Sequence, residues 1–258
     1  MEALFLKIVL TPALVGLASL AGRKWGAEVS GWIVGIPFTS GPIAFFLAIG
    51  PGPRFAADAS LGILAGTVSQ AAFALAYARM STGFGWPMSL AAATLAFAIA
   101  TLVLNVVRLG PALTFAAAVA TLLIALAFMP RPGRARASEE ALPWWDIPMR
   151  MVVATVFVVG LTEAAPALGS RLAGLLAPFP LYASVLAVFA NRLQGAAAVA
   201  AMLRGLLLGL FAFAGFFVTV AVLVVPQGIA IAFGVAIAVG LTVQALSLAA
   251  SRRYPLAA

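Results

Sequence analysis

The sequence predicts an all-α fold, a polytopic membrane helix bundle of about nine transmembrane helices with an inverted repeat of five plus four. Hydrophobic residues make up 64% of the chain and charged residues 9%, whereas a soluble domain has about 25% charged residues. Several apolar runs reach the roughly 20 residues that span a hydrocarbon core. A third observation, a match between the two halves of the chain, predicts the repeat.

Nine apolar segments with short connections are expected to cross the membrane. The first could instead be a signal peptide cleaved after Ala21. Lys7 interrupts its apolar region, and the repeat requires a full helix there, so a retained helix is the favoured interpretation. The predicted spans are 3–21, 30–50, 57–79, 86–107, 111–129, 148–167, 172–190, 199–225 and 228–250.

A polar linker divides the chain into two predicted transmembrane repeats, 1–130 and 148–258. The linker, 131–147, contains three arginines and three acidic residues. With nine spans, the fifteen basic residues divide into four on the side of the N-terminus and eleven on the other side. Because basic residues gather in cytoplasmic loops, we expect an inner-membrane protein of a bacterium with its N-terminus outside and its C-terminus in the cytoplasm.

A shift of 143 residues superposes glycines, prolines and phenylalanines of the two halves. Chance matches of Ala and Leu mean little in this composition, but Gly and Pro occupy positions specific to an element. Coincidence in a biased composition remains the alternative. The pairs are Gly26 and Gly169, Gly31 and Gly174, Pro37 and Pro180, Phe46 and Phe189, Gly62 and Gly205, Gly66 and Gly209, and Phe73 and Phe216. Inverted repeats are typical of secondary transporters.

The composition disfavours catalysis and metal binding. The chain has no histidine and no cysteine, so the commonest general base and the thiolate ligands are missing. We therefore expect no enzyme, no catalytic residue, no cofactor and no metal. Basic residues are scattered between apolar segments, so no nucleic-acid partner is expected. The expected partners are the lipid bilayer and a small-molecule or lipid-like substrate, and a homo-oligomer is left open.

The candidate site lies where two predicted spans are interrupted by proline. The segment 35–42 contains two prolines and two glycines, and its counterpart contains Pro178 and Pro180. Such interrupted segments in corresponding positions are the best sequence indication of a transporter site. The alternative is a pair of structural kinks. The candidate substrate-binding residues are Pro37, Thr39, Ser40, Gln70, Pro180, Tyr182 and Ser184, near the bilayer midplane at about 15 Å depth.

Two further features have competing interpretations. Gly62 and Gly66 match Gly205 and Gly209, and small residues at this spacing favour close helix packing over ligand binding. Glu163 lies within an otherwise apolar span and is a candidate for proton coupling. Otherwise it reaches headgroup water or pairs with Arg171.

The stretch Gly169–Phe189, with Arg171-Leu172-Ala173-Gly174 followed by Pro178-Phe179-Pro180, resembles small bacterial inner-membrane proteins of the GlpM-like kind. The inverted halves also resemble a shortened drug/metabolite-transporter plan, which usually has ten spans. These resemblances imply an inner-membrane protein of transporter type, and no functional residues are carried over from them.

The sequence therefore predicts a small secondary transporter or exporter of a neutral, amphipathic or lipid-like molecule, with its site between 30–50 and 172–190. The alternative is a non-transporting membrane subunit or assembly factor of an envelope system, whose broken helices would be structural. An intramembrane lipid-modifying enzyme is disfavoured by the missing histidine and cysteine.

Overall fold

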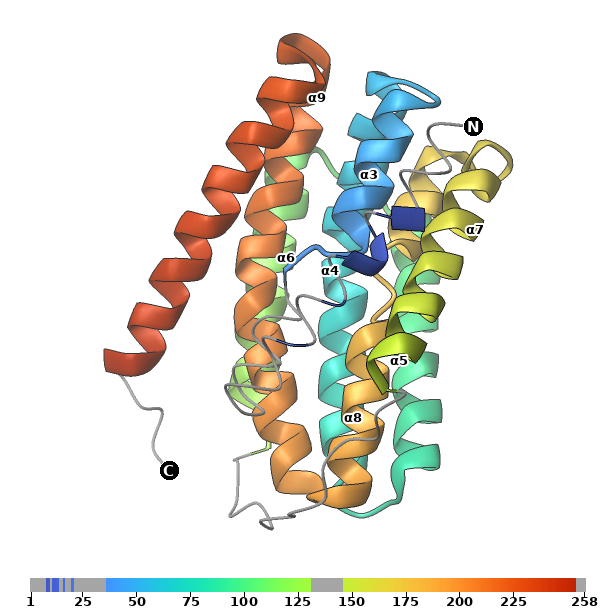
Figure 1. Cartoon of the computed structure of the whole chain (residues 1–258). Helices are drawn as coiled ribbons and strands as arrows, with labels where there is room; N and C mark the ends of the chain where they lie inside the picture. The colour runs from blue at the N-terminus through green and yellow to red at the C-terminus, as the bar shows by residue number, and fades with distance from the viewer. Residues whose placement is uncertain are drawn as a thin grey trace.

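The computed structural model describes residues 36–130 and 146–253, with a few isolated positions before 21. In these ranges the regular secondary structure is helical (Figure 1). The predicted span 3–21 lies almost wholly outside the described residues, as does the linker up to residue 145. The helices are α3 (Ser40–Ile49), α4 (Pro53–Met80), α5 (Trp86–Val106), α6 (Pro111–Phe128), α7 (Asp146–Leu176), α8 (Leu181–Leu193) and α9 (Ala196–Arg253).

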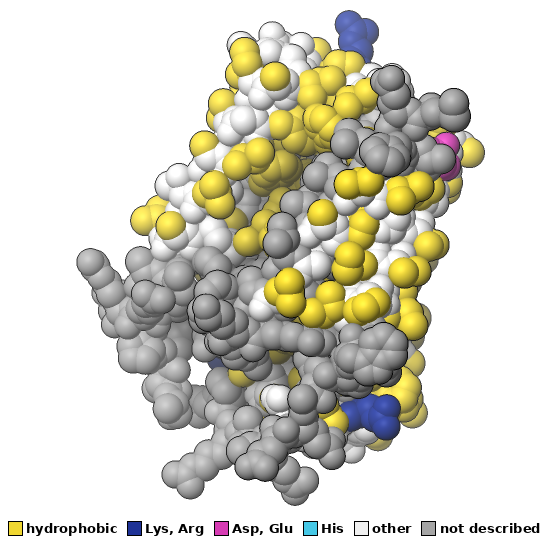
Figure 2. All heavy atoms as spheres, in the orientation of Figure 1, with side chains coloured by type: hydrophobic (Ala, Val, Ile, Leu, Met, Phe, Trp, Pro, Cys, Tyr) yellow, Lys and Arg dark blue, Asp and Glu magenta, His cyan; other side chains and the backbone are white. Residues whose placement is uncertain are grey.

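The chain is a multi-pass membrane protein. Within the described ranges, five helices are long and apolar enough to cross a membrane, namely α4, α5, α6, α7 and α9. Their outward faces carry large apolar side chains, including Leu102 and Val106 of α5 and Val156 of α7. In Figure 2, hydrophobic side chains are spread over the described part of the face, and Lys or Arg side chains lie towards its top and bottom. Such a surface is suited to lipid rather than to water.

Helix starts follow the prolines of the sequence. Proline occupies the first turn of α4, α5 and α6, where its missing N–H removes no helical hydrogen bond. The predicted span 57–79 begins too late, because α4 starts at Pro53 and carries Arg54 and Asp58 in its first two turns. The predicted linker 131–147 ends too late, since α7 already begins at Asp146.

Two of the long helices each contain a turn at a glycine. As one rod, the 58 residues of α9 would extend roughly 87 Å, against a hydrocarbon core of about 30 Å. Gly228 has φ +80°, and α9 folds back there into two antiparallel arms (Figure 1). Gly169, with φ +78°, turns α7 in the same way. The predicted span 172–190 is thus two helical pieces, the end of α7 and α8.

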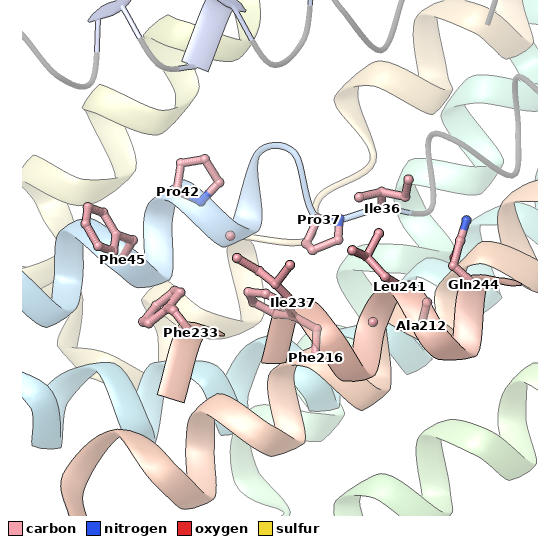
Figure 3. Close-up of a pocket in the computed structure, with 12 residues that line it drawn as sticks. Ile36, Pro37, Pro42, Phe45, Ala212, Phe216, Phe233, Ile237, Leu241 and Gln244 are labelled. Carbon is pink, nitrogen blue, oxygen red and sulfur yellow. The ribbon is translucent and has the colours of Figure 1, made fainter. Parts of the chain in front are cut away.

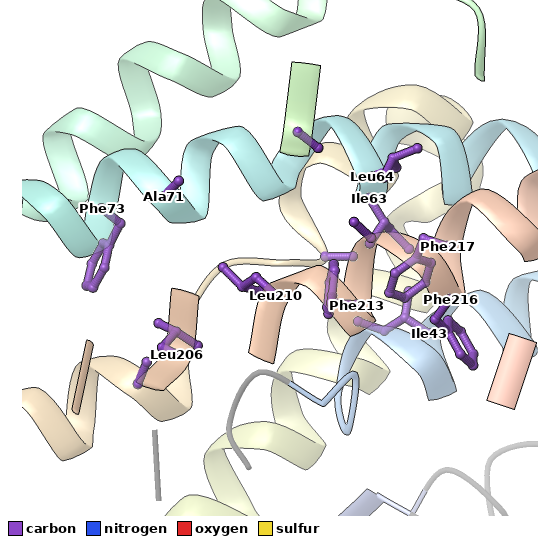
Figure 4. Packing of buried hydrophobic residues seen from close by; sticks show 14 of the residues in the cluster. Ile43, Ile63, Leu64, Ala71, Phe73, Leu206, Leu210, Phe213, Phe216 and Phe217 are labelled. Atoms are coloured by element: carbon purple, nitrogen blue, oxygen red, sulfur yellow. The ribbon is translucent and has the colours of Figure 1, made fainter. Parts of the chain in front are cut away.

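The buried core is centred on α4. Ile63, Leu64 and Phe73 of α4 are fully buried against apolar side chains of α9's first arm and of α3 (Figure 4). By contrast, most of α5 and α6 is exposed at the periphery. Among the five long apolar helices, the most enclosed is therefore α4, which carries Gln70.

Glycines allow α4 and α7 to approach closely. A Cβ at Gly62 would lie 2.8 Å from the Arg171 carbonyl oxygen, and one at Gly174 would lie 2.2 Å from the Ala59 carbonyl oxygen. A Cβ at Gly66 would lie 2.3 Å from Cγ of Pro178. These distances confirm the packing interpretation of Gly62 and Gly66. They also fix the end of α7 and the segment after it against α4.

Candidate functional site

The first helix break lies at 36–39, just before α3. The Phe38 N–H donates to the Ile36 carbonyl at 2.7 Å, which makes a tight turn. Helical bonding then starts with the Gly41 N–H, which donates to the Pro37 carbonyl at 2.9 Å. Thr39 is the N-cap of α3, and its side chain makes no capping hydrogen bond. The N-terminus of α3 is therefore not neutralised by its own side chains.

The second break lies at 177–180, between α7 and α8. The Phe179 N–H donates to the Leu176 carbonyl, and the Leu181 N–H donates back to the Phe179 carbonyl at 2.8 Å. Pro180 is the N-cap of α8 and offers no side-chain hydrogen bond. Two helices thus begin at proline-containing breaks in the interior of the bundle, without side-chain caps.

The two breaks meet in the middle of the bundle. The Ser40 hydroxyl donates to the Ala177 carbonyl at 3.0 Å. Between the breaks lies a cavity of about 30 Å³, room for roughly one water-sized group. Its lining comes from both breaks and from α4 and α9: Ile36, Pro37, Thr39, Ser40, Gln70, Pro178, Phe179, Pro180, Leu181, Tyr182, Ala183, Leu206 and Phe213. We call it the polar pocket.

Six of the residues predicted from the sequence line the polar pocket: Pro37, Thr39, Ser40, Gln70, Pro180 and Tyr182. Ser184 does not line it. The Ser184 hydroxyl donates to the Pro180 carbonyl at 2.7 Å, the local bonding of a structural kink. Glu163 lies on the exposed face of α7 and lines neither this pocket nor the cleft described below.

Gln70 places a hydrogen-bond acceptor without a partner in the polar pocket. Its side chain is 7% exposed, and its Oε1 has no hydrogen-bond partner in the structure as described. A buried polar atom that lacks a partner costs about 1–3 kcal/mol. A ligand that donates a hydrogen bond to Oε1 would remove this cost.

Tyr182 brings a buried arginine close to the pocket. Cζ of Arg150 lies 5.0 Å from the centroid of the Tyr182 ring, within the range of a cation–π contact. Arg150 is only 4% exposed. In the sequence, Arg150 counts only among the eleven basic residues that set the predicted topology, and its position near the start of a span gave little reason to expect burial.

Phe179 holds the second break in place with aromatic contacts. Its ring makes edge-to-face contacts with Phe97 of α5 at 5.1 Å and with Phe73 of α4 at 6.4 Å between centroids. Pro178, beside it, packs on Gly66. The second break is therefore fixed by two neighbouring helices.

A larger apolar cleft adjoins the polar pocket. It has a volume of about 250 Å³ and lies between the start of α3 and the two arms of α9 (Figure 3). Ile36 and Pro37 line both the cleft and the pocket. Among the described residues that line the cleft, Gln244 alone has a polar side chain. This cleft was not predicted from the sequence, because it depends on the fold of α9 at Gly228.

A charged region lies at the far end of α5, away from the polar pocket. The Arg171 guanidinium donates to the carbonyls of Leu104 at 2.5 Å, Asn105 at 3.1 Å and Val107. These carbonyls at the helix end have no helical donor, so Arg171 caps α5. Arg171 thus hydrogen-bonds to the backbone of α5, whereas the sequence left open a pair with Glu163.

Comparison of the chain with protein-family models, curated proteins and solved structures gave no match. The fold and the pocket therefore define the class, a multi-pass helical membrane protein with two helix breaks facing each other.

Proposed function

We propose that the protein is a small secondary transporter or exporter of a neutral, amphipathic or lipid-like molecule, bound between the two helix breaks. The observation that carries this proposal is the meeting of both breaks around one buried polar pocket. Non-helical backbone inside a membrane is tolerated where it is buried in protein or lines a cavity. In transporters, such broken helices supply the substrate site.

Backbone geometry supports the repeat of five plus four spans. Gly52 and Gly195 are 143 positions apart, and both have positive φ, at +112° and +84°. The helices that follow them begin at Pro53 and Ala196, again 143 positions apart. The sequence match alone did not include this pair of glycines. A positive φ is a backbone requirement rather than a compositional accident, so these glycines argue against coincidence.

The placement of the short helices supports inversion of the repeat. In Figure 1, α3 extends from the middle of the bundle towards one end, and α8 extends from the middle towards the other. Their N-termini consequently face each other. Two halves of opposite orientation that share a central site allow alternating access when the halves exchange conformations.

The proposed topology has nine spans in the inner membrane of a bacterium, with the N-terminus outside. The basic residues support it, because Arg79 bonds to the Phe128 carbonyl at one end of the bundle, while Arg108 and Arg171 lie at the other. Reporter fusions after Arg136 and at the C-terminus should indicate cytoplasm, and fusions after Arg54 and Arg108 should indicate the outside. A cytoplasmic signal at Arg108 would contradict nine spans.

Alternating access can be tested without knowing the substrate, because the chain has no cysteine. Thr39→Cys and Tyr182→Cys place single thiols in the polar pocket. In sealed vesicles of either orientation, a membrane-impermeant maleimide should modify both thiols from each side, at rates that differ between sides. Ala118→Cys, fully buried in α6, is the unreactive control, and Gly83→Cys, in the exposed turn between α4 and α5, measures labelling at the aqueous surface.

If the maleimide modifies Thr39→Cys and Tyr182→Cys from neither side of the membrane, the transport proposal is contradicted. That result would favour the alternative, a non-transporting membrane subunit or assembly factor whose breaks are structural.

Glu163 is kept as a candidate for proton coupling that acts outside the pocket. In reconstituted vesicles with an identified substrate, Glu163→Gln should abolish gradient-driven uptake and leave equilibrium exchange, and uptake against the gradient would contradict this role.

A further inference from the structure

The apolar cleft and the polar pocket lie on the two sides of one short segment. Ile36 and Pro37 form part of both linings. A molecule lying in the cleft would therefore end at the first break, next to Thr39 and Ser40. Ile36 and Pro37 thus separate an apolar cavity from a polar one, and a ligand that reaches from the cleft into the pocket has to pass this segment.

The cleft has the character of a site for a hydrocarbon chain. Phe45 of α3, Phe216 of the first arm of α9 and Phe233 of the second arm bound it at one end (Figure 3). On its outer edge, Ile237 and Leu241 are 52% and 61% exposed. In a membrane these side chains face lipid, so a single acyl-type chain can enter the cleft without leaving an apolar environment.

The polar pocket sets the chemistry of the head group. The N-termini of α3 and α8, neither of them capped by its N-cap side chain, offer N–H donors and a partial positive charge to an acceptor. Gln70 independently requires a donor, because its buried Oε1 has no partner in the described structure. A group that both accepts and donates satisfies both requirements, and a hydroxyl or a protonated carboxyl is such a group.

Pocket size limits the head group further. A cavity of about 30 Å³ holds roughly one water-sized group. A phospholipid head group is far too large for it. The head must therefore be compact, and the mass of the ligand must lie in the cleft of about 250 Å³.

We propose that the cleft and the polar pocket form one bipartite site for a single-chain amphiphile, with its hydrocarbon tail against α9 and its hydroxyl or carboxyl head between Gln70 and the starts of α3 and α8. This inference rests on the proposed function, because it names the class of substrate for the same site. Binding itself is measured independently of transport.

Photoaffinity labelling tests the site. Purified protein is irradiated with a hexadecanol that carries a diazirine in its chain, and the adducts are mapped by mass spectrometry. We expect adducts on α3 and on the second arm of α9. Gly240→Leu should reduce them by about tenfold, which corresponds to roughly 1.4 kcal/mol of binding. A Cβ at Gly240 meets Phe216 and Ala212 atoms only at 3.8–3.9 Å, so the leucine fits the backbone and fills the cleft.

Gly234→Leu is the matched control on the same arm. A Cβ at Gly234 meets nothing within 4 Å, and Gly234 does not line the cleft, so this variant should label like the natural chain. Equal labelling of the Gly240→Leu and Gly234→Leu variants would overturn the tail site, and so would labelling scattered over α5 and α6.

A second pair of variants tests the head group. Gln70→Leu should reduce labelling by hexadecanol and by the corresponding carboxylic acid. Thr67→Val should not, because this buried residue of the same helix does not line the pocket. A hexadecane probe, which lacks a head group, should label the natural chain and the Gln70→Leu variant to the same extent. Labelling by hexadecane as strong as that by hexadecanol would overturn head recognition.

The cysteine experiment separates this inference from the proposed function. If the thiols at positions 39 and 182 react from both sides but no amphiphile labels the cleft, the transport proposal stands and the proposed amphiphile site is overturned. Specific labelling in the cleft with thiols that react from neither side overturns transport and supports the binding site. Protection of Thr39→Cys from maleimide by hexadecanol supports both.

Discussion

The two helix breaks share a proline at corresponding positions, yet the protein holds them in different ways. Around the second break, Ala177, Pro178 and Pro180 are buried, and Phe179 is held between two aromatic rings. At the first break, the four residues 36–39 are all only partly buried. One break is anchored by α4 and α5, whereas the other borders the apolar cleft. We infer that the first break is the one free to change conformation when a ligand binds, against a fixed second break.

The largest loss of stability is expected where α4 anchors the second break. In Gly66→Ala the new Cβ would lie 2.3 Å from Cγ of Pro178, and overpacking of this kind costs about 1–3 kcal/mol. Thermal unfolding in detergent should show the loss. Gly160→Ala on α7 is the control, since a Cβ there meets nothing within 4 Å, and it should keep or slightly raise stability. Equal stability of the two variants would contradict the anchor.

A loss of stability of similar size is expected from removing the aromatic contacts of the second break. Phe179→Ala removes two edge-to-face pairs, each contributing about 0.5–1.5 kcal/mol. Ile36→Ala changes the position 143 residues earlier, which is partly buried beside the cleft. Thermal unfolding should therefore show a loss of stability at least twice as large for Phe179→Ala as for Ile36→Ala. Comparable losses would mean that both breaks are held alike.

The hydrogen bond between the breaks is expected to contribute less. Ser40→Ala removes the bond from its hydroxyl to the Ala177 carbonyl, a loss of about 0.5–1.5 kcal/mol. The neighbouring Thr39 makes no capping bond, so Thr39→Val should change stability by under about 0.5 kcal/mol. Denaturant or thermal unfolding of the two variants compares them. A larger loss for Thr39→Val would contradict this assignment of the bond.

The smallest change in stability is expected at Gln70, where a substitution should stabilise the protein rather than destabilise it. Gln70→Leu removes a buried acceptor that lacks a partner, so stability should stay equal or rise by up to about 1 kcal/mol. The adjacent Ser69→Ala is the contrast, because Ser69 accepts a hydrogen bond from the Thr101 hydroxyl at 2.9 Å and its loss should destabilise the protein. A destabilised Gln70→Leu variant would indicate a structural role for the amide rather than a ligand site.

Membrane character and the positions of the two breaks follow from local features of the sequence. Composition and run length decide whether a chain prefers lipid, and proline and glycine act on the backbone of their own turn. For this reason the prolines at 37 and 180 were sufficient to locate both breaks, and the starts of α5 and α6 lie where the sequence predicts them. These are local properties, which need no knowledge of neighbouring helices.

Which side chains face the pocket depends on how the helices pack against one another. Ser184 lies one helical turn after Pro180 and bonds to its own backbone, whereas Arg150 is buried against the Tyr182 ring. Glu163 faces outwards, and the apolar cleft forms only because α9 folds back at Gly228. The rotation of a helix about its axis and the partner it meets depend on packing between segments distant in sequence, and in a nearly uniform apolar chain the pattern of hydrophobic residues carries little information about either.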